Sequence, residues 1–151
     1  MEISRHQRRI FLVQAIFLWE DMAARKFELK RSDHEGMLRY IWEHFSSGSF
    51  DRDGNEFDLE RFFGMIEHID DLRKKLSEFA PDWPLEKVAS ADRAVLYLGL
   101  YELLYTDVPA AVAINEAVDL AKEFGGERSS KFVNGVLSSA NKQHGSKETR
   151  K

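Results

Sequence analysis

The side chains best suited to chemistry in this chain are four basic ones near its N-terminus: Arg5, His6, Arg8 and Arg9. They fall in the first turns of an expected helix, where the helix macrodipole disfavours each cation by a few tenths to about 1 kcal/mol. A purely structural role would favour acids at these positions. Arginine offers a planar fork that matches phosphate oxygens and a surface that stacks on bases. We interpret the cluster as a nucleic-acid contact, with a solvated helix end as the alternative.

The charge distribution supports the same interpretation. The net charge is −4, but residues 1–31 carry a net of +3 and residues 142–151 again carry +3, whereas residues 32–141 carry −10. Basic ends on an acidic body suit an RNA-contacting N-terminus on a body that binds a basic protein. A simple solvated surface remains the alternative.

Other kinds of site find little support. The chain has no cysteine, so disulfides and thiolate metal sites are excluded. Residues 51–55 imitate the start of a calcium loop, but its sixth and twelfth positions are Glu56 and Phe62 instead of Gly and Glu. The histidines lack zinc-site spacing, and no phosphate loop or paired acid–base carboxylates stand out. We therefore predict no catalytic residues, no metal, no cofactor and no enzymatic activity.

Helical spacing dominates the elements that would position the basic cluster. Pro and Gly are scarce, and apolar residues recur every three to four positions. Ser32 and Glu35 form an expected capping box, Gly126 belongs to a Gly-Gly helix stop, and Gly135 is expected to permit close helix packing. The spacing predicts helices over about 4–27, from Ser32 to about 45, and over 57–80, 91–105, 110–124 and 129–142.

The N-terminus also imitates a twin-arginine export signal, because an apolar run follows Arg8 and Arg9. The run is interrupted by Gln14 and followed at once by Glu20, and its apolar residues have the spacing of a core-facing helix stripe. It is also too short to span a bilayer as a helix. We therefore predict a cytoplasmic protein without membrane contact.

Specific residue runs mark these helices, above all in the last third of the chain. Residues 112–125 read Val-Ala-Ile-Asn-Glu-Ala-Val-Asp-Leu-Ala-Lys-Glu-Phe-Gly, and residues 131–137 read Lys-Phe-Val-Asn-Gly-Val-Leu. Upstream, residues 94–96 read Ala-Val-Leu and residues 100–104 read Leu-Tyr-Glu-Leu-Leu. Together these runs closely resemble the NusB family of bacterial transcription antitermination factors.

The resemblance implies an all-α fold of two packed small helical bundles with about seven helices. We expect one such domain over residues 1–144, with bundles at about 1–80 and 81–144, followed by a disordered basic tail at 145–151. The resemblance also implies binding of boxA-like single-stranded RNA together with the ribosomal protein NusE. That assembly joins the RNA polymerase antitermination complex and helps polymerase read through terminators, notably in ribosomal RNA operons.

The resemblance further implies roles for individual residues. The basic cluster takes the place of the family's arginine-rich RNA-binding segment, and Lys122 and Lys131 extend the RNA surface. Asp92, Arg128 and Phe132 match positions that face NusE. From the residues alone, a core position of Phe132 on its helix remains the alternative.

Two functions of other classes stay open. The chain could be a helical protein–protein adaptor without RNA affinity. It could also be a stand-alone relative of the NusB-like RNA-binding domain that precedes some RNA cytosine methyltransferases. RNA binding and its salt dependence separate the adaptor from an antitermination factor.

Overall fold

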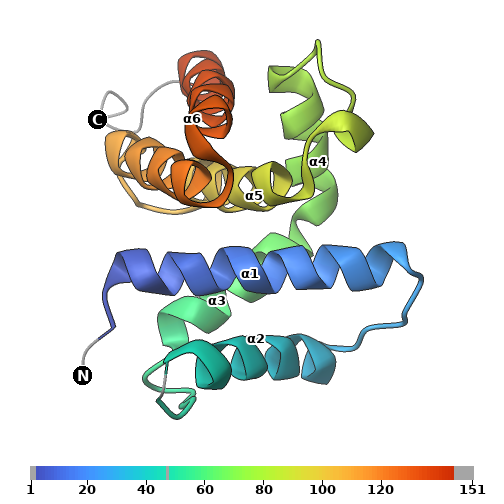
Figure 1. Cartoon of the computed structure of the whole chain (residues 1–151), viewed down its shortest axis with the longest axis vertical. Helices are drawn as coiled ribbons and strands as arrows, with labels where there is room; N and C mark the ends of the chain where they lie inside the picture. Colours follow the sequence, from blue (N-terminus) through green and yellow to red (C-terminus); the bar gives the residue numbers. More distant parts are fainter. Residues whose placement is uncertain (1–2, 47, 145–151) are drawn as a thin grey trace. The chain divides into compact units, whose positions relative to one another are not determined.

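The computed structural model describes residues 3–46 and 48–144, and this part of the chain contains helices and no strand (Figure 1). The expected all-α class is therefore confirmed. The elements in chain order are α1 (Arg5–Ala24), α2 (Arg31–Ser46), α3 (Glu56–Glu67), α4 (Ile69–Phe79), the short 3₁₀ helix η1 (Leu85–Lys87), α5 (Ser90–Tyr105) and α6 (Ala110–His144). They divide into two compact units, Met1–Glu67 and His68–Lys151.

The first unit is built on α1, which packs against both α2 and α3. The apolar run that imitated an export signal forms its core, and Leu12 and Ile16 are fully buried there. Phe11 meets Trp42 of α2 edge to face, with ring centroids 5.5 Å apart. Burying a side chain of this size contributes roughly 1.5–3 kcal/mol. The helical spacing of this segment is thus explained by packing.

The second helix begins differently from the expected capping box. It starts at Arg31, and the Asp33 carboxylate accepts a hydrogen bond from the Lys30 amide at 2.9 Å. Glu35 does not reach back to Ser32, because its carboxylate binds the guanidinium groups of Arg52 and Arg39. The capping-box prediction is therefore wrong, since an ion pair across the fold competes for the Glu35 side chain.

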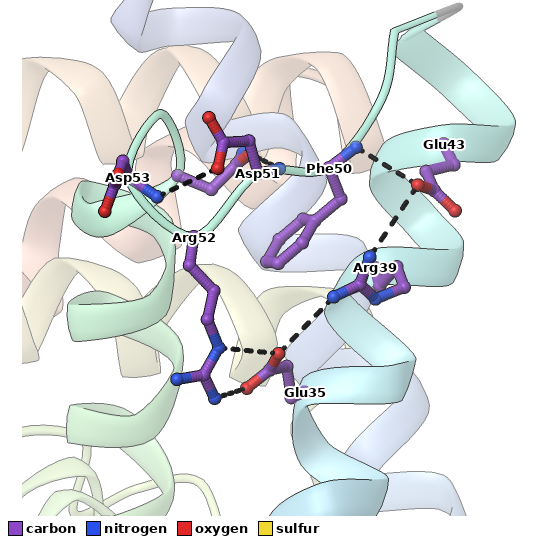
Figure 2. Close-up of polar contacts among 8 residues, drawn as sticks. Glu35, Arg39, Glu43, Phe50, Asp51, Arg52 and Asp53 are labelled. Atoms are coloured by element: carbon purple, nitrogen blue, oxygen red, sulfur yellow. Dashed lines mark hydrogen bonds and ion pairs between the residues drawn. The ribbon is translucent and has the colours of Figure 1, made fainter.

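These ion pairs tie the segment before α3 to the side of α2 (Figure 2). The Phe50 amide donates to the Glu43 carboxylate at 3.1 Å, and the Phe50 ring is buried. The Asp53 amide donates to the Asp51 carboxylate at 3.3 Å, as in an ordinary Asx turn. The Asp51 amide donates to the Asn55 side chain at 3.0 Å. The turn delivers Gly54 and Asn55 to the start of α3.

The helix expected over 57–80 is two helices, because His68 departs from helical geometry (φ −103°, ψ 16°). Its imidazole stacks on Tyr105, with ring centroids 4.3 Å apart. The α4 helix packs against α5 and α6, so the division between units lies at Glu67 and His68 and not near residue 80. The apolar residues keep helical spacing on both sides of His68, so the sequence pattern does not reveal the break.

The second unit is dominated by the packing of α5 on α6. Ten consecutive residues of α5 are buried, from Ala94 to Leu103. Gly99 permits the close approach, because a Cβ there would lie 2.9 Å from Leu137 Cδ1 and 3.1 Å from Ala117 Cβ. Nothing lies within 4 Å of a Cβ built on Gly135, so the close packing expected there occurs at Gly99 instead.

A kink at Gly126 joins the two helices expected over 110–124 and 129–142, and both belong to α6 (Figure 1). Gly126 has φ 85° and ψ −165°, a conformation that a side chain with a Cβ rarely adopts. The Ser130 hydroxyl donates to the Glu127 carbonyl at 2.9 Å, which satisfies one backbone group beside the kink. The expected Gly stop is thus a bend between two helical halves.

None of the helices in the described ranges is long and apolar enough to cross a membrane. The basic tail expected at 145–151 lies outside the described residues.

Candidate nucleic-acid interface

The N-terminus of α1 presents the predicted arginines from a capped helix end. The Ser4 hydroxyl accepts a hydrogen bond from the Gln7 amide at 3.1 Å, and the first turn contains no acidic residue. Arg5 is exposed at the surface, whereas Arg9 is only 5% exposed. His6 is half-buried. The four basic residues that sequence spacing groups together thus have different environments.

Arg8 is held by the protein itself. One guanidinium nitrogen lies 2.5 Å from the Asp58 carboxylate of α3 and 3.4 Å from the Gly54 carbonyl oxygen. The guanidinium carbon also lies 4.9 Å from the centroid of the Trp42 ring. These contacts anchor the start of α1 to α2, α3 and the turn between them. The charge of Arg8 is therefore matched inside the unit.

Asp58 is the buried partner in this ion pair. Its side chain is 1% exposed and accepts a second hydrogen bond, from the side-chain amide Nδ2 of Asn55, at 3.0 Å. Burial raises the pKa of Asp58 above its ordinary value, while the Asn55 hydrogen bond and the Arg8 charge act in the opposite direction. Breaking a buried ion pair on one side typically costs about 3–5 kcal/mol. We therefore regard the Arg8–Asp58 pair as a structural anchor.

The Phe57 ring gathers the remaining cations of this region. The guanidinium carbon of Arg5 lies 3.9 Å from its centroid, that of Arg61 lies 4.5 Å away and that of Arg9 lies 5.7 Å away. Cations over an aromatic face are attracted by the ring quadrupole, by about 0.5–1 kcal/mol at exposed sites. An aromatic residue of α3 therefore organises arginines that come from α1 and α3.

A cleft of about 810 Å³ opens beside this arrangement, between the first turn of α1 and the start of α3. Its lining includes the exposed Arg5 as well as Arg61, whose guanidinium is 2.5 Å from the Glu60 carboxylate. Asp53 and Glu56 line it too, so the cleft is of mixed charge. The full lining comprises Ile3, Ser4, Arg5, Arg8, Asp53, Gly54, Glu56, Phe57, Glu60 and Arg61. A guanidinium fork beside an aromatic face can bind a phosphate that is attached to a planar base.

The predicted partner-binding residues belong to the second unit. Phe132 is half-buried and meets the exposed Trp83 edge to face, with centroids 6.1 Å apart. Asp92 is also half-buried, and its carboxylate lies 3.5 Å from a Cβ built on Gly125. Arg128 is exposed beside the α6 kink. Phe132 is thus neither a fully buried core residue nor an isolated exposed one.

Lys122 and Lys131 are both exposed on α6. Lys122 lies on the N-terminal side of the kink and forms an ion pair with Glu127 at 3.1 Å, and Lys131 lies on its C-terminal side. They belong to the second unit, whereas the predicted arginines belong to the first.

Metal sites have no visible basis in the part of the chain that the structure describes. There, no three His, Asp or Glu side chains come together in a way that could hold an ion.

Comparison with known proteins identifies the family. The model of the NusB family matches residues 6–142. The transcription antitermination protein NusB of Methylacidiphilum infernorum is 35% identical over 146 residues, which cover 96% of this chain and 95% of that protein. The chain belongs to the NusB family.

Solved structures of the NusB family agree with the fold. The T. maritima NusB structure has 32% identity and a TM-score of 0.79, covering 98% of this chain and 97% of its own. A NusB–NusE complex with double-stranded RNA contains a chain of the same fold, with 20% identity and a TM-score of 0.74 over 93% of this chain. The expected NusB-like fold is therefore confirmed.

Sequence reasoning missed two residues that line the cleft of this NusB family member, Phe57 and Arg61, and also Asp58, the buried partner of Arg8. Phe57 lies outside the apolar stripe of its helix, which was the one available sign that its ring serves another purpose. The sequence analysis assigned no role to Arg61 or Asp58. No local pattern links them to arginines about 50 positions earlier, because that link exists only after α1 has packed on α3.

Proposed function

We propose that this chain is an RNA-binding transcription antitermination factor. It binds boxA-like RNA together with ribosomal protein NusE and helps RNA polymerase read through terminators, notably in ribosomal RNA operons. The proposal rests on one observation: a relative named as a transcription antitermination protein matches this chain over nearly the full length of both. The same fold occurs in a solved assembly of NusB, NusE and RNA. We expect the protein to act in the cytoplasm and to catalyse no reaction.

The RNA contact of this proposal lies at the N-terminus of α1. The predicted contact residues there are Arg5, His6, Arg8 and Arg9, of which Arg5 is exposed. Exposed Lys122 and Lys131 are proposed as further RNA contacts. In single-stranded RNA each phosphate contact releases counterions and contributes about 0.7 to the salt slope of binding. Only a few contacts are available, so we expect weak binding by the chain alone.

The NusE contact lies on the second unit, at Asp92, Arg128 and Phe132. Aromatic residues in desolvated pockets contribute much of the energy of a protein interface. Phe132 is half-buried beside exposed Trp83, which suits an anchor. Asp92 adds complementarity to a basic partner, and this affects specificity and association rate more than affinity.

The test is a binding titration of the whole chain with a fluorescent boxA-like RNA, with and without NusE, at several salt concentrations. We expect weak, salt-sensitive binding alone and much tighter binding with NusE. A scrambled RNA serves as the matched control for sequence preference.

Two outcomes would favour the other classes. NusE binding without RNA binding under any condition would identify a helical adaptor. RNA binding that NusE does not strengthen would favour a stand-alone relative of the RNA-binding domain of RNA cytosine methyltransferases.

A further inference from the structure

We propose that the cleft between α1 and α3 binds one phosphate group of single-stranded RNA through Arg5, and that Phe57 positions Arg5 for this contact. The inference deepens the proposed function and rests on it. It adds Phe57 of α3 to the RNA contact, a residue outside the arginine cluster that sequence spacing identifies.

The arginines on α1 differ in how accessible they are to a ligand. Asp58 matches the charge of Arg8 at 2.5 Å, and Arg9 is 5% exposed. Arg5 is exposed at the mouth of the cleft. It is therefore the arginine of this cluster best placed to meet a phosphate from solvent.

The ring of Phe57 holds the Arg5 side chain in place. Its guanidinium carbon lies 3.9 Å from the Phe57 centroid. An unsupported arginine on a first helical turn samples many rotamers, and a ligand must immobilise it. A guanidinium already resting on a ring loses less freedom on binding, which raises affinity by preorganisation.

The acidic residues of the cleft limit how many phosphate groups it can accept. Asp53, Glu56 and Glu60 line it alongside the arginines, and Glu60 pairs with Arg61. A second phosphate beside the first would face these carboxylates. We therefore expect one phosphate contact here, with the attached base lying against apolar or guanidinium surface.

A matched control lies on the same helix. The Phe63 ring has the guanidinium carbon of Arg31 at 4.0 Å, and Phe63 is half-buried like Phe57. This pair has the same chemistry and nearly the same distance but does not line the cleft. Phe63→Leu thus reports what loss of a cation–π contact on α3 does in general.

The experiment measures binding of the whole chain with NusE to a fluorescent boxA-like RNA. We expect Phe57→Leu to raise Kd about three- to tenfold, in line with the loss of one cation–π contact and its preorganisation. Phe63→Leu should change Kd less than about twofold, and Phe57→Tyr should retain affinity because the ring remains. Melting temperatures of the two leucine variants should be similar.

Two further measurements test whether Arg5 and Phe57 act through the same RNA contact. Arg5→Gln should reduce the salt slope of RNA binding by about 0.7, the value for one contact to single-stranded RNA. Adding Phe57→Leu to Arg5→Gln should weaken binding little further, because both act through one contact. Independent, multiplicative effects would overturn the positioning role.

Other outcomes would overturn the proposal that this cleft binds RNA. Wild-type RNA affinity in Phe57→Leu, or equal losses in both leucine variants that follow their stability, overturns the cleft proposal alone. A wild-type chain that binds no RNA overturns the proposed function and this inference with it. A polyglutamate peptide that binds with the same dependence on Phe57 would assign the cleft to an acidic protein instead.

Discussion

At the scale of single residues, the N-terminal arginines differ because of what packs around each one. Arg8 is an internal anchor through Asp58, whereas exposed Arg5 lies over the ring of Phe57. A triple substitution of the arginines would mix a folding defect with a loss of RNA contacts. Single substitutions are therefore needed to separate the two effects.

Asp58 makes stability depend on pH in a stated direction. Burial raises the pKa of Asp58 in the folded chain, so the folded state binds the carboxyl proton more tightly than the unfolded state does. The resulting stabilisation of the fold is fully present below the unfolded-state pKa of about 3.9. It is lost as the pH rises through the folded-state pKa. We expect the unfolding free energy of the parent chain relative to Asp58→Asn to be larger at pH 4 than at pH 7. Urea denaturation of both proteins at each pH measures this. A difference that grows with rising pH would contradict it.

Phe132 is expected to anchor NusE. Phe132→Ala should weaken NusE binding by at least about 2 kcal/mol with little change in stability, because its ring is half-buried beside exposed Trp83. Calorimetric titration and thermal melting measure the two effects. Val133→Ala is the control, since this fully buried neighbour should affect stability and leave NusE affinity unchanged. A stability loss of about 3–5 kcal/mol in Phe132→Ala would instead identify a core residue.

At the scale of elements, α6 shows how one backbone conformation shapes a surface. The kink at Gly126 lies between Lys122 and Lys131, and exposed Arg128 follows it directly. A straight helix would present these side chains in a different arrangement. The glycine is therefore required by conformation, whereas Gly99 is required by the close approach of α5 to α6.

Two glycines of α6 should respond to alanine in opposite directions. Gly126→Ala places a Cβ at φ 85° and should destabilise by about 1–2 kcal/mol. Gly135→Ala has open space around its Cβ in a helix and should stabilise by roughly 0.5–1 kcal/mol. Chemical denaturation of both variants measures the effects. Equal destabilisation by the two variants would contradict this explanation of the kink.

At the scale of the whole molecule, each of the two units has buried residues of its own. Leu12, Leu38 and Phe62 belong to the first unit, while Tyr97 and Leu120 belong to the second. The candidate RNA contacts around Phe57 belong to the first unit, and the candidate NusE contacts around Phe132 belong to the second.

The second unit should fold without the first. A fragment of residues 68–151 contains α4, α5 and α6, and the α5–α6 packing is internal to it. We expect a helical circular dichroism spectrum and a cooperative thermal transition, at lower stability than the whole chain because a smaller unit buries less surface. A fragment that shows no cooperative transition would mean that its core requires residues 1–67.

The sequence alone determined the all-α class, the family and most helix positions, because helical periodicity and specific residue runs are local properties of a chain. The helix predicted over 91–105 is observed as α5 (Ser90–Tyr105), and the Gly-Gly stop is observed as the Gly126 bend. The break at His68 escaped prediction because one non-helical residue leaves the apolar period intact.

Only the tertiary structure decided which members of the basic cluster are available to a ligand. The environment of Arg8 depends on Asp58, fifty positions away, and that of Arg5 depends on Phe57. Burial and pairing are set by which helices pack together, so residues of one type at neighbouring positions acquire different roles. The cleft beside Phe57 likewise exists only where α1 and α3 meet, and no local pattern in either helix describes it.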